Sequence, residues 1–144
     1  MLYTSLTKIA MHIAFDAHKE QTDKSGLPYI FHPFHLAEHM TDELSVCAAL
    51  LHDVAEDSPL TFPDLAARGI PAEVIAVLRL LTHADDVPYM DYVQAIKNSG
   101  NAAAIAVKLA DLRHNADTAR LDVVREKDLQ RVEKYKAAIA LLEA

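Results

Sequence analysis

The sequence contains little of what stabilises small disulfide-rich or β-sheet proteins. It has one cysteine, three glycines and no tryptophan among 144 residues. A single cysteine cannot form an internal disulfide, so Cys47, which stands among small apolar residues, is expected to be a buried core residue. No segment shows the alternation of polar and apolar residues that is typical of strands. A chain of this length can bury its own core, and we expect one domain over residues 1–144.

Positive charge and long apolar runs are also scarce. Fourteen Lys and Arg against 21 Asp and Glu give a net charge of −7, without a basic cluster. We therefore expect neither nucleic acid nor an anionic membrane as a partner. The beginning of the chain lacks the apolar centre of a signal peptide, and the longest apolar runs, 46–51 and 102–107, are too short to span a bilayer. These features indicate a cytoplasmic protein, and they do not specify its oligomeric state.

Strong helix formers dominate the remaining residues and predict an all-α fold. Ser5, Asp42, Thr61 and Asn101 are the expected N-terminal caps, and prolines and glycines mark the breaks between helices. Residues 22–32 are expected to form a loop, with Pro33 opening the helix after it. The predicted helices cover about 5–21, 34–40, 42–56, 61–69, 71–81, 88–97, 102–117 and 126–142.

The segment LLHDVAED, residues 50–57, places one histidine and three acids directly behind an apolar run. On a continuous helix, His52, Asp53, Glu56 and Asp57 would lie within about 140° of one another, opposite the apolar side. Such a polar side either lines a site or is an ordinary solvated face at a helix end.

A second segment, NAAAIAVKLADLRHNAD, predicts a helix that is largely buried, because eight of the nine residues 102–110 are apolar. Lys108, Asp111 and Asn115 form a polar stripe on it. A buried Asp111 needs a cation, a hydrogen-bonding network or a metal. A salt bridge to Lys108 or Arg113 is the simplest of these.

A histidine in the segment YIFHP, His32, adds a third candidate. Alone it would be an ordinary loop histidine. Together with the two helices it completes a mixed set of nitrogen and oxygen ligands of the kind that Mn²⁺, Fe²⁺ or Zn²⁺ accepts.

Three segments, in matching order and spacing, resemble one known family. HDVAED resembles the HDxxED motif of the HD superfamily of metal-dependent phosphohydrolases. AHKEQTDKSGLPYIFHP and VKLADLRHN resemble the flanking segments of its Rel/SpoT-type branch. That branch contains the hydrolase domains of long alarmone enzymes and small free-standing alarmone hydrolases. The resemblance extends from Ala14 to about Arg120.

The resemblance implies an all-helical HD domain that removes the 3′-pyrophosphate of guanosine tetra- or pentaphosphate, ppGpp or pppGpp, with a nucleotide as its small-molecule partner. One divalent ion, Mn²⁺ in the first place and Fe²⁺ or Zn²⁺ as alternatives, would activate a water. The implied metal ligands are His32, His52, Asp53 and Asp111. The implied catalytic acids are Glu56 and Asp57. The implied substrate contacts are Lys24, Ser25, Tyr29 and Asn115, with Lys108 a candidate for the phosphates.

The chain departs from the family pattern at Asp23, where long alarmone hydrolases typically carry an arginine that packs on guanine. A carboxylate offers no cationic plane to a base. If this departure matters, Asp23→Arg should raise turnover of guanine alarmones.

Three alternatives follow. The same site could act on a dinucleotide phosphate or another phosphate ester. A two-iron oxidative site would need extra histidines, for which His35, His39, His83 and His114 are spare. A nucleotide-binding module without turnover is the third. The last predicted helix is expected to cover the core, and a partner surface is its alternative role.

Overall fold

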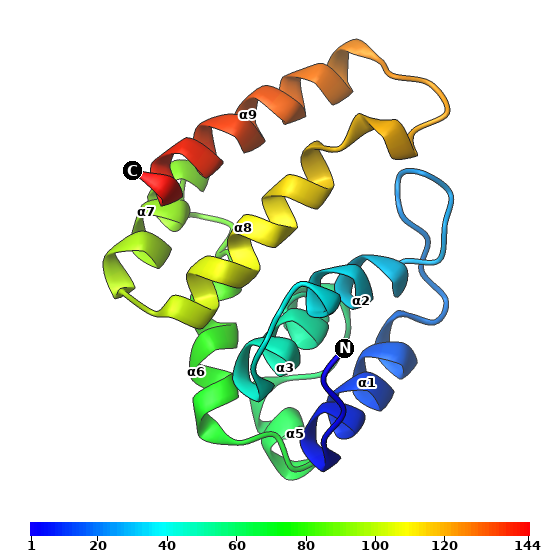
Figure 1. The fold of residues 1–144 in the computed structure, drawn as a ribbon, viewed down its shortest axis with the longest axis vertical. Helices are drawn as coiled ribbons and strands as arrows, with labels where there is room; N and C mark the ends of the chain where they lie inside the picture. Colours follow the sequence, from blue (N-terminus) through cyan, green and yellow to red (C-terminus); the bar gives the residue numbers. More distant parts are fainter.

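The computed structural model describes residues 1–144 as helices and connecting loops without a strand (Figure 1). The predicted all-α fold is confirmed. The helices are α1 (Ser5–His18), α2 (Phe31–Glu38), α3 (Glu43–Leu51), α4 (Val54–Asp57), α5 (Phe62–Ala67), α6 (Ala72–Leu81), α7 (Tyr89–Ser99), α8 (Ala102–Ala116), the 3₁₀ helix η1 (Thr118–Arg120) and α9 (Glu126–Glu143). None of them combines the length and the apolar character that crossing a membrane requires.

Side-chain caps begin four of the helices, α1, α3, α5 and α8. The side chains of Asp42, Thr61 and Asn101 each accept a backbone N–H three residues further on, as the sequence predicted. The first helix differs, because its cap is Thr4 and not Ser5. Thr4 forms reciprocal bonds with Thr7, and the helix ends at His18 instead of Gln21.

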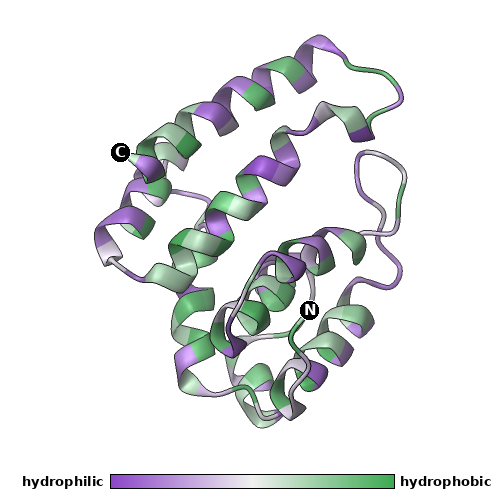
Figure 2. Cartoon of the chain, in the orientation of Figure 1, coloured by the Kyte–Doolittle hydropathy of each residue, from purple (hydrophilic) through white to green (hydrophobic).

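Helix α3 lies at the centre of the core. Residues 45–51 are all buried, and α1, α2, α6 and α8 pack around them. A helix surrounded in this way can be apolar on every side, which explains the run Val46–Leu51. Helix α9 runs beside α8 and ends near α7 (Figure 1). It alternates between hydrophilic and hydrophobic residues along its length (Figure 2). Its residues Ala138 and Leu142 belong to the core, so α9 covers the core as expected.

Two predicted boundaries at the motifs are wrong. The helix expected over 42–56 is interrupted, because α3 ends at Leu51 and Asp53, at φ −106° and ψ 1°, has left the helical conformation before α4 begins. His32 does not lie in a loop. Helix α2 begins one residue before it, at Phe31, because Pro33 is tolerated in the first turn, where backbone N–H groups have no helical partner.

Candidate metal site and adjoining pocket

Three of the predicted ligands form a compact group. The ligating atoms of His32, His52 and Asp53 lie within 4.8 Å of one another. Asp111 joins them, because its Oδ1 is 2.9 Å from His32 Nε2 and 3.6 Å from His52 Nε2. Both histidines are only 4% exposed. The four side chains come from α2, the junction of α3 with α4, and α8, so the fold unites segments that are far apart in the sequence.

The interruption between α3 and α4 brings two consecutive residues to the same point. In a continuous helix, neighbouring side chains diverge by about 100°. His52 is the C-terminal cap of α3, and Asp53 turns away from the helical conformation, which leaves His52 Nε2 only 3.0 Å from Asp53 Oδ2. The break that the sequence did not predict is therefore what assembles this half of the group.

The hydrogen bonds of His52 indicate that a cation fits here. Its Nδ1–H donates to the carbonyl oxygen of Ala49 at 2.7 Å. The other nitrogen, Nε2, is buried without a hydrogen-bond partner while it faces two carboxylates. Burial opposes protonation, but Asp53 and Asp111 together outweigh it and raise the pKa of His52 well above its ordinary value. Imidazole nitrogen and carboxylate oxygen together are a donor set that a divalent ion accepts.

His114 contacts His32 from outside the ligand group. His32 Nδ1 lies 2.7 Å from His114 Nδ1, and the two rings stack at 4.9 Å and 9°. The His35 ring stacks on His114 with centroids 4.1 Å apart, and the His39 ring lies 4.6 Å from His35. Burial, together with Arg120 and the neighbouring histidines, lowers the pKa of His114 to about 4. At neutral pH, His114 is therefore uncharged and has one ring nitrogen able to accept.

The polar side chains of the α8 stripe meet at Asp111. Lys108 Nζ donates to Asp111 Oδ2 at 2.9 Å, and Asn115 Nδ2 donates to Oδ1 at 3.0 Å. Burial would raise the pKa of Asp111, but Lys108 and the imidazoles hold it well below its usual range. The simpler interpretation of the stripe, an ion pair, and the ligand interpretation hold together, because the two oxygens have different partners. Lys108, expected to meet phosphate, is engaged with Asp111.

Tyr29 fixes the remaining carboxylate. Its hydroxyl donates to Asp53, and its ring lies 4.8 Å from His18 and 5.7 Å from His32. His18 is 1% exposed and binds Gln21 Oε1 at 2.8 Å through Nδ1. Tyr29, expected only as a substrate contact, therefore also orients a candidate ligand.

The structure separates the last two acids of the HDxxED motif, Glu56 and Asp57. Glu56 lines a cavity of about 110 Å³ together with His52, Asp53 and Asp111, and its Oε1 accepts the backbone N–H of His83 at 2.5 Å. Burial and the nearby acids raise the pKa of Glu56. Asp57 does not line this cavity.

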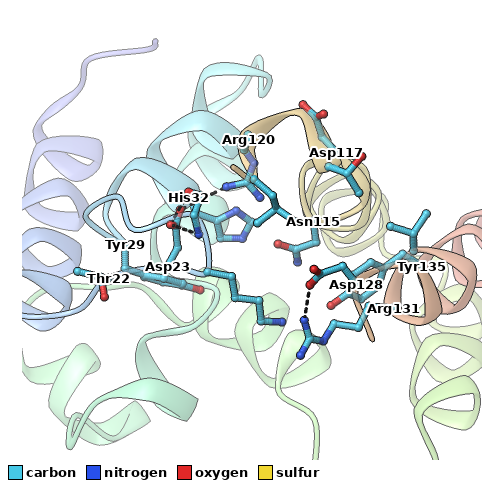
Figure 3. Close-up of a pocket in the computed structure, with 15 residues that line it drawn as sticks. Thr22, Asp23, Tyr29, His32, Asn115, Asp117, Arg120, Asp128, Arg131 and Tyr135 are labelled. Atoms are coloured by element: carbon cyan, nitrogen blue, oxygen red, sulfur yellow. Dashed lines mark hydrogen bonds and ion pairs between the residues drawn. The ribbon is translucent and has the colours of Figure 1, made fainter. Parts of the chain in front are cut away.

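A larger pocket of about 310 Å³ opens beside the metal group, and His32 lines it (Figure 3). One wall is the loop between α1 and α2, a second is the end of α8 with η1, and the third is α9 (Figure 3). The expected substrate contacts Lys24, Ser25, Tyr29 and Asn115 all line it.

Sequence reasoning did not place α9 at the pocket, although four of its residues line it, among them Arg131 and Tyr135. Their spacing of four residues puts them on one face of the last helix, which was the available signal. What the sequence does not show is that this face meets the loop near residue 24. The roles of His114 and Arg120 depend in the same way on contacts between distant segments.

The chain resembles parts of larger proteins. No protein-family model matches it. It is 36% identical over 122 residues to the bifunctional (p)ppGpp synthase/hydrolase SpoT of Escherichia coli (strain K12), a match that covers 74% of this chain and 17% of that protein. It is 31% identical over 135 residues to the guanosine-3′,5′-bis(diphosphate) 3′-pyrophosphohydrolase of Aquifex aeolicus, covering 87% and 19%. The chain thus spans less than a fifth of these curated relatives.

The fold also matches a solved structure, described as a metazoan ortholog of SpoT that hydrolyzes ppGpp and plays a role in starvation responses. The TM-score is 0.81 with 22% identity, over 100% of this chain and 89% of the other. Sequence and fold agree with the three motifs: over most of its length the chain is similar to one part of Rel/SpoT-type proteins. Its fold is that of the solved SpoT ortholog.

Proposed function

We propose that this chain is a metal-dependent phosphohydrolase that removes the 3′-pyrophosphate of guanosine tetra- or pentaphosphate. The observation that carries the proposal is the buried, unpartnered Nε2 of His52 among carboxylates, directly beside a pocket of nucleotide size. Relatives that are about a third identical to this chain over the aligned residues are named for this activity, which supports the substrate.

We assign one divalent ion, Mn²⁺, to His32, His52, Asp53 and Asp111. Such an ion, when bound, would offset charge on phosphoryl oxygens and lower the pKa of a water towards neutrality. Fe²⁺ and Zn²⁺ suit the same donors. Lys108 and Tyr29 act on this group indirectly, because each holds one of its carboxylates in place.

Glu56 is the proton acceptor in this proposal. It lines the same small cavity as the ligands, and the N–H of His83 fixes one of its oxygens, so the other is free to take a proton from an attacking water. Asp57 contributes its negative charge, which helps to raise the pKa of Glu56. In the larger pocket, Lys24, Ser25 and Asn115 contact the sugar and the remaining phosphates.

Two alternatives are distinguished by the structure and by assay. A related substrate, such as a dinucleotide phosphate or another phosphate ester, would use the same metal group and is favoured only by the presence of Asp23. A two-iron oxidative site is disfavoured, because His35 and His39 stack outward behind His114 and the compact ligand group contains none of the spare histidines.

The test is a panel of Mn²⁺-loaded reactions with guanosine tetraphosphate, nicotinamide dinucleotide phosphate, ordinary nucleotides and simple phosphomonoesters. Pyrophosphate released fastest from guanosine tetraphosphate, and lost in the Glu56→Ala, Asp57→Ala double variant, supports the proposal. Faster turnover of another ester would identify that ester as the substrate of the same site. No turnover of any compound would favour a binding module. Action in the cytoplasm stays a prediction.

A further inference from the structure

We propose that Asp23 and Arg120 form one recognition element, in which Asp23 holds the Arg120 guanidinium as the flat wall on which the nucleobase of the substrate packs. The inference rests on the proposed function, since it concerns the base of that nucleotide. It assigns specificity to η1, a segment that the three motifs do not include.

Asp23 is occupied by its own loop and by Arg120. Its Oδ1 accepts the backbone N–H of Ser25 at 2.9 Å, the Ser25 hydroxyl at 2.5 Å and the backbone N–H of Leu27 at 3.0 Å. Its Oδ2 lies 3.3 Å from Arg120 Nη1, an ion pair across 97 positions of sequence. The Asp23 side chain is 11% exposed. Asp23 therefore shapes the loop and anchors an arginine from the opposite wall.

Arg120 is held at a second point. Its Nη2 donates to the carbonyl oxygen of His114 at 3.1 Å, at the end of α8. Fixed at both terminal nitrogens, the guanidinium has little rotational freedom left to lose when a ligand binds. The side chain keeps 26% of its surface exposed and lines the pocket that His32 also lines (Figure 3).

The charges of the pocket decide between a base and a phosphate as the group that meets Arg120. Asp23 already neutralises Arg120, which makes its guanidinium a poor site for a further anion but leaves its face available for stacking. Lys24 has no ion-pair partner. Burial and the nearby cations Arg131 and Lys134 lower the pKa of Lys24. A phosphate would relieve that repulsion, so the phosphates belong beside Lys24 and the base beside Arg120.

These contacts reverse the expectation for Asp23→Arg. An arginine at position 23 would lose all three hydrogen bonds of the loop and would place a second cation against Arg120. We therefore expect the variant to bind guanine nucleotides less well than the wild type, and not better.

The test compares two ligands that differ only in the base, guanosine 5′-diphosphate and ribose 5-diphosphate, by calorimetry on the Mn²⁺-loaded protein. Arg120→Lys keeps the charge and removes the plane. This variant should bind guanosine 5′-diphosphate about tenfold more weakly than the wild type does. Its affinity for ribose 5-diphosphate should stay within about twofold of the wild-type value. Asp23→Asn should also lower the affinity for guanosine 5′-diphosphate. The double variant, Asp23→Asn with Arg120→Lys, should bind this ligand no more weakly than Arg120→Lys alone. Arg79→Lys is the matched control, because Arg79 lies over the Phe62 ring outside the pocket.

Each result has one meaning. If Arg120→Lys binds both ligands as tightly as the wild type does, or loses affinity for both by the same factor, the proposal is overturned. Arg120→Gln separates the roles further, since a phosphate-binding arginine would lose ribose 5-diphosphate affinity in this variant. Pyrophosphate release by the wild type tests the proposed function separately. A wild type without turnover that still shows the base-dependent loss would retain Arg120 as a base contact and discard the reaction.

Discussion

Replacement of His114 by phenylalanine tests how the outer histidine supports the proposed metal site. For His32 Nε2 to bind a metal, its ring proton must be on Nδ1, and His114 Nδ1, 2.7 Å away, is its acceptor. Phenylalanine can keep the ring stacks at 4.9 Å and 4.1 Å but cannot accept a hydrogen bond. A buried donor without its acceptor costs about 1–3 kcal/mol, so Mn²⁺ should bind about 5- to 150-fold more weakly.

The assay is calorimetric titration of metal-free protein with Mn²⁺ against a competing chelator, so that no turnover is needed. His114→Gln, whose amide oxygen can accept, should recover part of the affinity. His35→Phe is the matched control, because His35 stacks on His114 without a hydrogen bond to His32, and this variant should leave the affinity within about twofold. Wild-type affinity in His114→Phe would show that His32 needs no acceptor, and the reasoning would be wrong.

Further predictions concern the base, the thiol and one turn. The pKa of Glu56 is raised above 4.5, and the protonated acid cannot accept a proton. The acid limb of the kcat/KM profile should therefore lie at a higher pH than an ordinary glutamate gives. A pH profile without this limb would exclude Glu56 as the base. Cys47 is fully buried and burial raises its pKa to about 11, so a thiol reagent at pH 8 should label unfolded protein only, and labelling of the folded protein would contradict that burial. Gly100 ends α7 at φ +65° with open space around its Cα, so Gly100→Ala should lower the free energy of unfolding by about 1 kcal/mol for backbone reasons alone, and an unchanged denaturation midpoint would count against this.

Features that depend on contacts between residues close in the sequence could be predicted, and features that depend on contacts between distant residues could not. The caps Asp42, Thr61 and Asn101 bond to residues three positions away, so local sequence was sufficient for those helix starts. The break at Asp53 was not predictable from helix propensity, because strong helix formers, Leu51 before it and Ala55 after it, lie close on either side. The ligand group is what uses the break.

The candidate site follows the same rule. The motifs predicted His32, His52, Asp53 and Asp111 as one group, and the structure brings them together. The ion pair of Asp23 with Arg120 joins positions 97 residues apart, and no local pattern indicates it. Asp23 looked unsuited to a nucleotide site because its partner was not visible in the sequence.

The two parts of the site are built on different kinds of structure. The four candidate ligands lie on helices or at a helix junction within the core, where a changed side chain disturbs packing as well as chemistry. The larger pocket is lined mainly by the loop before α2, by η1 and by the outer helix α9. Such connecting and peripheral segments tolerate substitution far better than a core does. Under the proposed function, the choice of nucleotide can therefore change during evolution through the pocket while the metal group stays the same.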